Sequence, residues 1–234
     1  MTNSSDDALT TEAKGEQECA RCGKPRALCV CADIMPIDNR VELLILQHPQ
    51  EQDRELGTAR LTLLHVKHAT LRIGLSWPSL AKALGRPADP KHWAVLYLGA
   101  ASRKNLPRDR EVVAVDGKGS PLAEQERILD EIEGVVLLDG SWSQAKTLWW
   151  RNPWVLKCHR LALNPKRRSR YGALRREPRR EGLSTLEAAA LTLSLLAAQP
   201  EIEVALIRSF AGLLARYRAL HAHSDQSAAN SRRN

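Results

Sequence analysis

The sequence predicts an α/β domain with a mostly parallel sheet flanked by helices. Short, continuous apolar runs, typical of strands buried on both faces, alternate along the chain with amphipathic helical patterns. Several of the runs end directly in a polar or turn-forming pair of residues. Because ligands of such sheets bind beyond the carboxyl ends of the strands, those pairs are the first places to search for a functional site.

The strands are predicted from the apolar runs. Val41–Gln47 is one such run and ends at His48-Pro49, and Gly134–Leu138 is the clearest buried strand and ends at Asp139-Gly140. Further strands are expected at Trp93–Leu98, at Glu111–Val115 and within Trp154–Leu163. The strand ends at 48–49, 98–99 and 139–142 are therefore candidate ligand-binding segments.

Helices are predicted where apolar residues recur with helical spacing. These segments are Pro121–Glu133, with Pro121 in its first turn, Ser143–Trp150, Leu186–Ala198 and Glu201–His221. Residues 1–17 and 221–234 are polar and without periodicity, so we expect a disordered lead and a disordered tail. The parts between them are a small cysteine-rich segment at 18–36 and a main domain at 37–220.

The positive charge is concentrated in one segment. The 234-residue chain carries a net charge of +8, and Lys157–Arg180 alone holds ten Lys or Arg against one Glu. Such a block favours a nucleic-acid partner, although a solvated face or a disordered arm gives the same composition. No apolar run is long enough for a membrane helix and no signal peptide is visible, so we expect a cytoplasmic protein without a membrane partner.

Four of the five cysteines form a compact cluster in the sequence. Cys19, Cys22, Cys29 and Cys31 give the spacing C-x2-C-x6-C-x-C. Four thiolates in thirteen residues can bind one tetrahedral Zn²⁺, and with no open coordination position the ion would be structural. An iron–sulfur cluster is the alternative. Cys158 stands alone and is expected to be a buried small side chain.

The segment Leu138-Asp139-Gly140-Ser141-Trp142 carries the strongest functional pattern in the chain. It places a carboxylate at the tip of a buried strand, followed by a glycine that permits close approach, a hydroxyl and an indole. Asp139 is therefore a candidate base facing a ligand crevice. The alternative is that Asp139 only caps the following helix and that Trp142 is a core aromatic residue.

Asp139-Gly140-Ser141-Trp142 resembles the D-x-[ST]-W signature of the DTW-domain family, and other segments resemble that family's motifs in the same order. They are the four-cysteine knuckle, His48-Pro49 followed by Thr58-Ala59-Arg60-Leu61, the segment 95–99, and Glu181–Ala188 (EGLSTLEA). Ser141, Leu98 and Gly57 stand where Thr, Pro and Asn are common, and the first change keeps the hydroxyl. The resemblance covers residues 19 to about 215.

The resemblance implies a SPOUT-like fold with a C-terminal knot that holds S-adenosylmethionine. It also implies transfer of the 3-amino-3-carboxypropyl group to N3 of a tRNA uridine, with methylthioadenosine as by-product. Asp139 and Trp142 would then be catalytic. The residues expected to bind the cofactor are His48, Thr58, Leu98, Leu138, Gly140, Ser141, Ser184, Thr185 and Glu187.

Two of these roles have simpler alternatives. Ser184 and Glu187 have the spacing of a helix capping box, and a strand-end histidine such as His48 is often bound locally.

The basic residues expected to hold tRNA phosphates are Lys166, Arg167, Arg168, Arg170, Arg175, Arg176, Arg179 and Arg180, with Arg21, Lys24 and Arg26 of the knuckle as a second contact.

Three other functions fit parts of the sequence. A SPOUT-type RNA methyltransferase would use the same cofactor but release S-adenosylhomocysteine. A non-catalytic RNA-binding module would use only the cysteines and arginines, and it leaves Asp139 at a strand tip without a role. A purely structural zinc protein does not account for the local positive charge.

Overall fold

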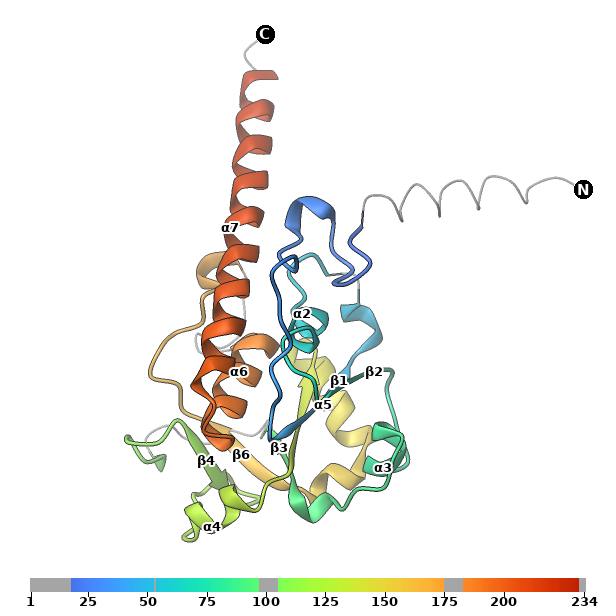
Figure 1. The fold of residues 1–234 in the computed structure, drawn as a ribbon, viewed down its shortest axis with the longest axis vertical. Helices are drawn as coiled ribbons and strands as arrows, with labels where there is room; N and C mark the ends of the chain where they lie inside the picture. The colour runs from blue at the N-terminus through green and yellow to red at the C-terminus, as the bar shows by residue number, and fades with distance from the viewer. Residues whose placement is uncertain (1–17, 53, 97–104, 175–182, 232–234) are drawn as a thin grey trace, which may run out of the picture.

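The computed structural model describes residues 18–52, 54–96, 105–174 and 183–231. Within them, six strands form one sheet and helices cover both of its faces, which confirms the predicted α/β class (Figure 1). The strands are β1 (Glu42–Gln47), β2 (Ala69–Ile73), β3 (Trp93–Leu96), β4 (Val112–Val115), β5 (Gly134–Asp139) and β6 (His159–Leu163).

The strand order is β2-β1-β5-β3-β6-β4, and only β4, at one edge, is antiparallel to its neighbour. The two strands that matter most for function lie side by side at the centre. Glu42 of β1 is level with Gly134 of β5, and Gln47 is level with Asp139. The carboxyl ends of β1 and β5 therefore meet at one edge of the sheet, as the sequence predicts.

Six described α-helices and several 3-10 turns accompany the strands; α2 to α5 lie between strands, and α6 and α7 follow β6. The helices are α2 (Ala59–Leu63), α3 (Leu80–Leu84), α4 (Gln125–Asp130), α5 (Trp142–Arg151), α6 (Thr185–Leu196) and the long α7 (Pro200–Ser231). The 3-10 turns are η1 (Arg26–Leu28), η2 (Pro49–Glu51), η3 (Pro90–His92), η5 (Pro153–Lys157) and η6 (Gly172–Leu174).

Two apolar cores lie on opposite faces of the sheet, because side chains alternate along each buried strand. Leu43 and Ile45 of β1 pack into the larger core with α2, α6 and α7, whereas Leu44 and Leu46 pack into the smaller core with α3. Figure 1 shows the same arrangement, with α6 and the base of α7 on one side of the strands and α3 on the other. Both central strands are therefore shielded from water on each face.

Two predicted helices differ in length from the observed ones. The helix expected at 121–133 is reduced to α4, and Pro121 lies outside it in an isolated bridge with Val115. Gln125 explains the late start, because its amide exchanges hydrogen bonds with both backbone groups of Ala114 in β4. Conversely, α7 continues to Ser231, over most of the tail predicted to be disordered; this stretch contains no Gly or Pro to stop a helix that is already formed.

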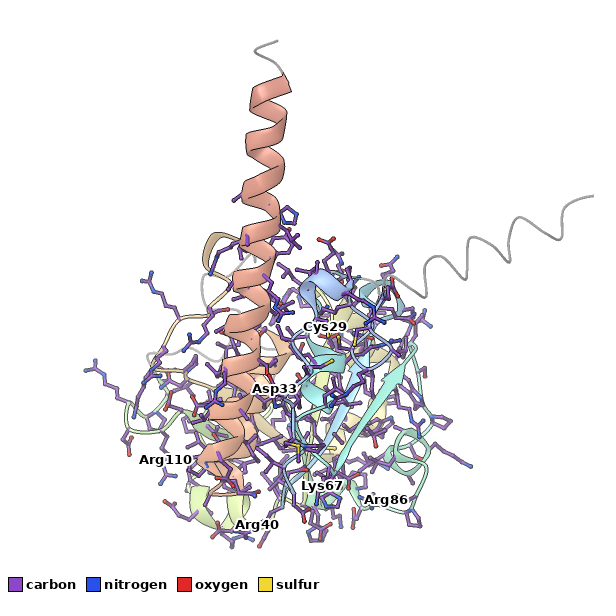
Figure 2. The ribbon with its side chains drawn as sticks, turned by 45° about the horizontal axis from the view of Figure 1, so that its top comes forward. Cys29, Asp33, Arg40, Lys67, Arg86 and Arg110 are labelled. Atoms are coloured by element: carbon purple, nitrogen blue, oxygen red, sulfur yellow. The ribbon has the colours of Figure 1, made fainter. Side chains whose placement is uncertain are left out.

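The surface of the domain is rich in ion pairs, and Figure 2 shows charged side chains around its lower edge. Arg86 pairs with Glu42, and Arg110 pairs with Glu126. Exposed pairs of this kind add little to stability. Among the described residues, no helix combines the length and the apolar character that a bilayer span requires.

Candidate active site and cysteine cluster

Asp139 ends the central strand β5 and is held by side chains from two other elements. The residue as a whole is 8% exposed. One oxygen, Oδ2, accepts a hydrogen bond from Gln47 Nε2 at 2.7 Å, and the other accepts one from the Thr185 hydroxyl. The carboxylate is thus fixed in orientation, and each oxygen keeps a lone pair for a further donor.

The turn after Asp139 is shaped by Gly140 and Ser141. A Cβ at Gly140 would lie 2.8 Å from Gln144 Cβ, so a larger residue cannot fit without a shift. Ser141 is the N-cap of α5 and forms a capping box with Gln144. The helix cap is therefore Ser141, and the alternative reading of Asp139 as that cap is wrong.

Trp142 and His48 flank Asp139. Trp142 is half-buried in the first turn of α5, and Lys146 Nζ lies 5.6 Å from its ring centroid. The backbone N–H of His48 donates to the Asp139 carbonyl at 2.9 Å, while the His48 ring nitrogen Nδ1 accepts from the Gln50 N–H at 3.3 Å. The His48 side chain is thus bound locally through Nδ1.

The start of α6 joins two of the predicted motifs. Ser184 is its N-cap, and Ser184 and Glu187 form a complete capping box, as the simpler alternative predicted. The Thr58 hydroxyl accepts a hydrogen bond from the Leu186 N–H at 3.2 Å. Side chains therefore satisfy the amides of Leu186 and Glu187, while Thr185, the first residue of the helix, donates its hydroxyl to Asp139.

Glu187 also connects α6 to the basic segment. It is 5% exposed, and besides the Ser184 N–H it accepts hydrogen bonds from the Ser169 hydroxyl at 2.8 Å and the Arg170 N–H at 2.7 Å. The neighbouring basic side chains are exposed: Lys166, Arg167, Arg168 and Arg170. The basic segment is therefore anchored beside the helix that contacts Asp139.

Leu138 is the remaining predicted donor-site residue within the described part of the chain. Leu138 is half-buried at the end of β5 and packs against the smaller core. Leu98, Arg175, Arg176, Arg179 and Arg180 lie outside the described residues.

Gln47, the residue before His48, belongs to the site but was not predicted from the sequence. Gln47 is buried, and its Oε1 atom has no hydrogen-bond partner in the structure. Its position was nevertheless visible in the sequence, since a polar side chain at the end of an otherwise apolar strand is unusual and needs a partner. The register of β1 and β5 supplies that partner by placing Gln47 level with Asp139.

A hollow of about 510 Å³ lies elsewhere, at the amino ends of β1 and β5. It is open and polar, and it is lined by Asp38, Asn39, Arg40, Glu42, His68 and Glu133. Because it lies at the opposite end of the strands from Asp139, it is separate from the candidate site.

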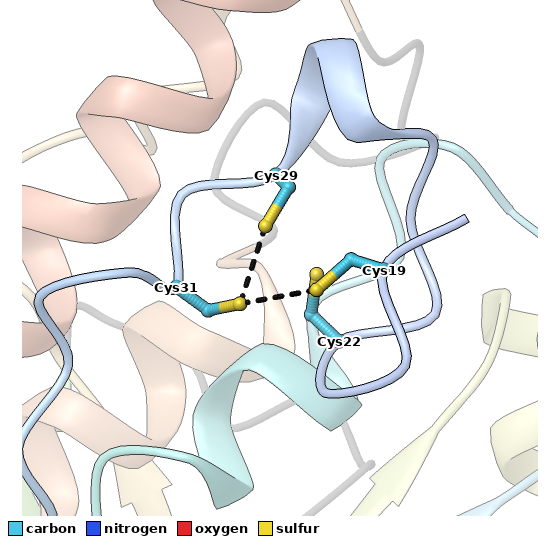
Figure 3. Close-up of side chains that lie close together, drawn as sticks. All are labelled: Cys19, Cys22, Cys29 and Cys31. Atoms are coloured by element: carbon cyan, nitrogen blue, oxygen red, sulfur yellow. Dashed lines mark hydrogen bonds between the residues drawn. The ribbon is translucent and has the colours of Figure 1, made fainter. Parts of the chain in front are cut away.

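The four clustered cysteines come together as predicted (Figure 3). Their sulfur atoms all lie within 4.8 Å of one another, and Cys31 Sγ lies 3.4 Å from Cys19 Sγ and 3.2 Å from Cys29 Sγ. A tetrahedral ion with zinc–sulfur bonds of about 2.3 Å needs sulfur separations of roughly 3.8 Å, so the four residues fit Zn²⁺ with small adjustments.

Burial affects the thiols unequally. It raises the pKa of Cys22 to about 11 and also raises the pKa of Cys31, whereas the backbone N–H of Cys22 lowers the pKa of Cys19 to about 6. A bound cation would favour the thiolate form at all of these positions. Cys158, by contrast, is buried away from the cluster in the smaller core, and burial raises its pKa to about 12.

The knuckle is part of the main fold. Cys22, Leu28 and Cys31 belong to the larger core, and Arg216 of α7 donates to the Cys29 carbonyl. Arg21 donates to the carbonyls of Cys31 and Ile34. Lys24 is buried, with its ammonium 3.2 Å from the Arg54 carbonyl, and burial lowers its pKa to about 8. Lys24 is therefore not available for the RNA contact that the sequence suggested.

The fold and the site define an α/β protein with a carboxylate at a central strand end, a capped helix beside it and a four-thiolate cluster packed on the core. A family model described as the DTW domain matches residues 16–218. The chain belongs to the DTW domain family, which confirms the resemblance seen in the motifs.

Curated relatives carry a functional name. A protein of Mus musculus is 30% identical over 206 residues, which are 86% of this chain and 63% of the relative, and one of Drosophila melanogaster is 29% identical over 197 residues, 82% of this chain and 71% of the relative. Both are named tRNA-uridine aminocarboxypropyltransferase 2. The chain thus spans about 63% of the length of the mouse relative. No solved structure matches the chain.

Proposed function

We propose that this chain transfers the 3-amino-3-carboxypropyl group of S-adenosylmethionine to N3 of a uridine in tRNA, releasing methylthioadenosine in the cytoplasm. Membership in the DTW domain family and the names of the relatives support the class of reaction. The observation that carries the proposal for this chain is the placement of Asp139. Its carboxylate lies at the carboxyl end of a central strand and is held by Gln47 and Thr185, which come from two other segments of the chain.

Asp139 is proposed to act on the acceptor. Uridine N3–H is a weak acid and a poor nucleophile while it keeps its proton, so a carboxylate within hydrogen-bond reach promotes attack. N3 would form a bond to the methylene carbon beside the sulfonium, the carbon–sulfur bond would break with its electron pair passing to sulfur, and Asp139 would take the proton. Gln47 and Thr185 hold the carboxylate in place for this step.

The donor is proposed to lie against the same strand end. Trp142 can stack on a base or attract the sulfonium through its ring face. The other residues that we propose to line the donor site are His48, Thr58, Leu98, Leu138, Gly140, Ser141, Ser184, Thr185 and Glu187. The buried Gln47 Oε1 atom, which lacks a hydrogen-bond donor, fits an ammonium or imide N–H in this site. Glu187 is proposed to act by shaping the start of α6, since its oxygens are engaged within the protein.

The basic segment is proposed to hold tRNA phosphates. Lys166, Arg167, Arg168 and Arg170 are exposed beside the start of α6, and phosphate contacts there would position the substrate without reading its bases. The four cysteines would bind a structural Zn²⁺ that stabilises the knuckle. We also propose that the C-terminal part of the fold forms a SPOUT-like knot around the donor site.

The decisive experiment is mass spectrometry of nucleosides from tRNA incubated with the purified protein and S-adenosylmethionine. The proposal predicts a uridine heavier by one aminocarboxypropyl group, together with methylthioadenosine. A methylated nucleoside with S-adenosylhomocysteine would instead establish a methyltransferase. If the purified protein binds tRNA but modifies none, the non-catalytic binding module is the better description.

A further inference from the structure

The outer face of α5 exposes an indole that the fold does not use. Trp150 is 76% exposed, the largest exposed fraction of any described tryptophan, whereas its neighbour Trp149 packs against the smaller core. Lys146 lies one helical turn before Trp150, and Trp142 lies one turn before Lys146. The three side chains therefore follow one side of the helix, starting beside Asp139.

The segment of the chain that carries Trp150 is basic and contains no acidic residue. No Asp or Glu occurs in the sequence from Gly140 to Arg176, a stretch that includes all of α5 and β6. Arg151, the residue after Trp150, and Lys157 in the following 3-10 turn are both exposed, and the partly exposed Leu156 lies between them in the chain. An aromatic ring in a basic surface is the combination that binds single-stranded nucleic acid, because every base can stack on an indole.

We propose that Trp150 and Lys146 form a stacking platform for unpaired nucleotides that flank the target uridine. The inference rests on the proposed function, because it takes an RNA as the substrate. Trp150 lies eight residues after Trp142, about 12 Å along the helix, which is the length of a few bases stacked at about 3.4 Å each. An RNA strand leaving the candidate site along α5 would thus reach Trp150 with its next unpaired bases, while Lys146 contacts the phosphate chain.

An RNA partner fits this face better than a second copy of the chain. Two copies meeting here would bring Lys146, Arg151 and Lys157 together without an acidic residue from the same segment to balance them. A nucleic acid supplies the negative charge and the flat apolar rings at once. Self-association through Trp150 is nevertheless a measurable alternative outcome.

The test measures binding of the full-length protein to two labelled RNAs by fluorescence anisotropy. One is a stem-loop with uridines in its unpaired loop, and the other is a fully paired duplex with the same number of nucleotides. Trp150→Ala should weaken binding to the stem-loop by about fivefold or more and leave binding to the duplex unchanged. Trp150→Tyr should restore stem-loop binding, whereas Trp150→Leu should not, because only an aromatic ring stacks on a base.

Two further variants separate charge from stacking. Lys146→Ala should reduce the slope of log K against log salt by about 0.7, the value for one phosphate contact of a single strand, whereas Trp150→Ala should leave that slope unchanged. Met35→Ala is the matched control, because Met35 is 80% exposed on the knuckle, and it should bind both RNAs like the wild type.

Each other result counts against the platform. Equal binding of the stem-loop by wild type and Trp150→Ala overturns it, as does an equal loss for the duplex or full rescue by Trp150→Leu. A dimer that becomes a monomer in Trp150→Ala, measured by sedimentation, would assign the face to self-association. If the wild type modifies tRNA in the nucleoside assay while Trp150→Ala binds normally, only the platform fails; if the wild type binds neither RNA, the proposed RNA substrate fails with it.

Discussion

Replacement of Glu187 by Ala should destabilise the whole domain, because this one carboxylate connects three parts of the chain. It accepts hydrogen bonds from the Ser184 N–H, the Ser169 hydroxyl and the Arg170 N–H, all at 2.7–2.8 Å. Glu187 is 5% exposed and Ser184 is 1% exposed, so water cannot freely replace the lost acceptor at the start of α6.

The size of the effect follows from these contacts. A hydrogen bond to a charged group contributes about 1.5–3 kcal/mol, and the three bonds are not additive because two of the donors lie near the surface. Loss of the capping box and of the tether together should therefore cost about 3–4 kcal/mol. For a chain of this size, that corresponds to a fall in Tm of about 10 °C.

Two variants of intermediate effect make this prediction specific. Ser169→Ala removes the hydrogen bond to Glu187 and the longer one that the Ser169 hydroxyl accepts from the Tyr171 N–H, but it keeps the capping box, so it should cost about 1–2 kcal/mol. Glu187→Gln keeps one acceptor oxygen, but its NH₂ group must face a backbone N–H, and it should fall between the other two variants. The measurement is denaturant unfolding followed by circular dichroism. A Glu187→Ala protein as stable as the wild type, or no more affected than Ser169→Ala, would refute the reasoning.

Three other predictions test the site and the core. Asp139→Asn should keep the Tm near the wild-type value but reduce nucleoside modification by about 100-fold or more, because an amide cannot take the N3 proton; an active Asp139→Asn would exclude Asp139 as the base. Removal of zinc by a chelator, or the substitution Cys29→Ser, should lower the Tm of the entire domain, because the knuckle packs into the larger core. A metal content near zero in the purified wild-type protein would contradict the metal site. Burial lowers the pKa of His65 to about 4, so the unfolded chain binds more protons between about pH 6.5 and pH 4 and stability falls as the pH falls through that window. The loss of stability over this pH range should be smaller in His65→Gln than in the wild type. Unfolding midpoints of the two proteins that depend equally on pH would count against this role of His65.

The sequence predicts the centre of the fold well because its strands are long apolar runs buried on both faces. β1 and β5 were both expected within a residue of their observed bounds. β2 was missed, since its residues Ala69–Ile73 include Thr and Arg and are only partly buried at the sheet edge. α2 and α3, with five residues each, are too short for helical periodicity to be visible.

The motifs of the candidate site could be predicted from the sequence, but the hydrogen bonds between them could not. The D-x-[ST]-W turn and the capping-box spacing of Ser184 and Glu187 are local patterns, so the sequence shows them directly. The contacts of Asp139 with Gln47 and Thr185 join residues that are 92 and 46 positions away, and they depend on the sheet register and on how α6 packs. No local pattern carries that information.

Asp139 and Glu187 are both buried carboxylates beside the start of α6, but they differ in how far their acceptor positions are occupied by hydrogen bonds. Glu187 accepts three hydrogen bonds, two of them from backbone N–H groups that need an acceptor in any folded state, so its role is to hold the chain together. Within the described part of the chain, the Asp139 carboxylate is bound by the side chains of Gln47 and Thr185 alone, which can shift with a ligand, and it lies at a strand end rather than within a helix. A carboxylate that is held in orientation but keeps unoccupied acceptor positions can accept a proton from a substrate. For this reason we assign the role of base to Asp139 and a structural role to Glu187.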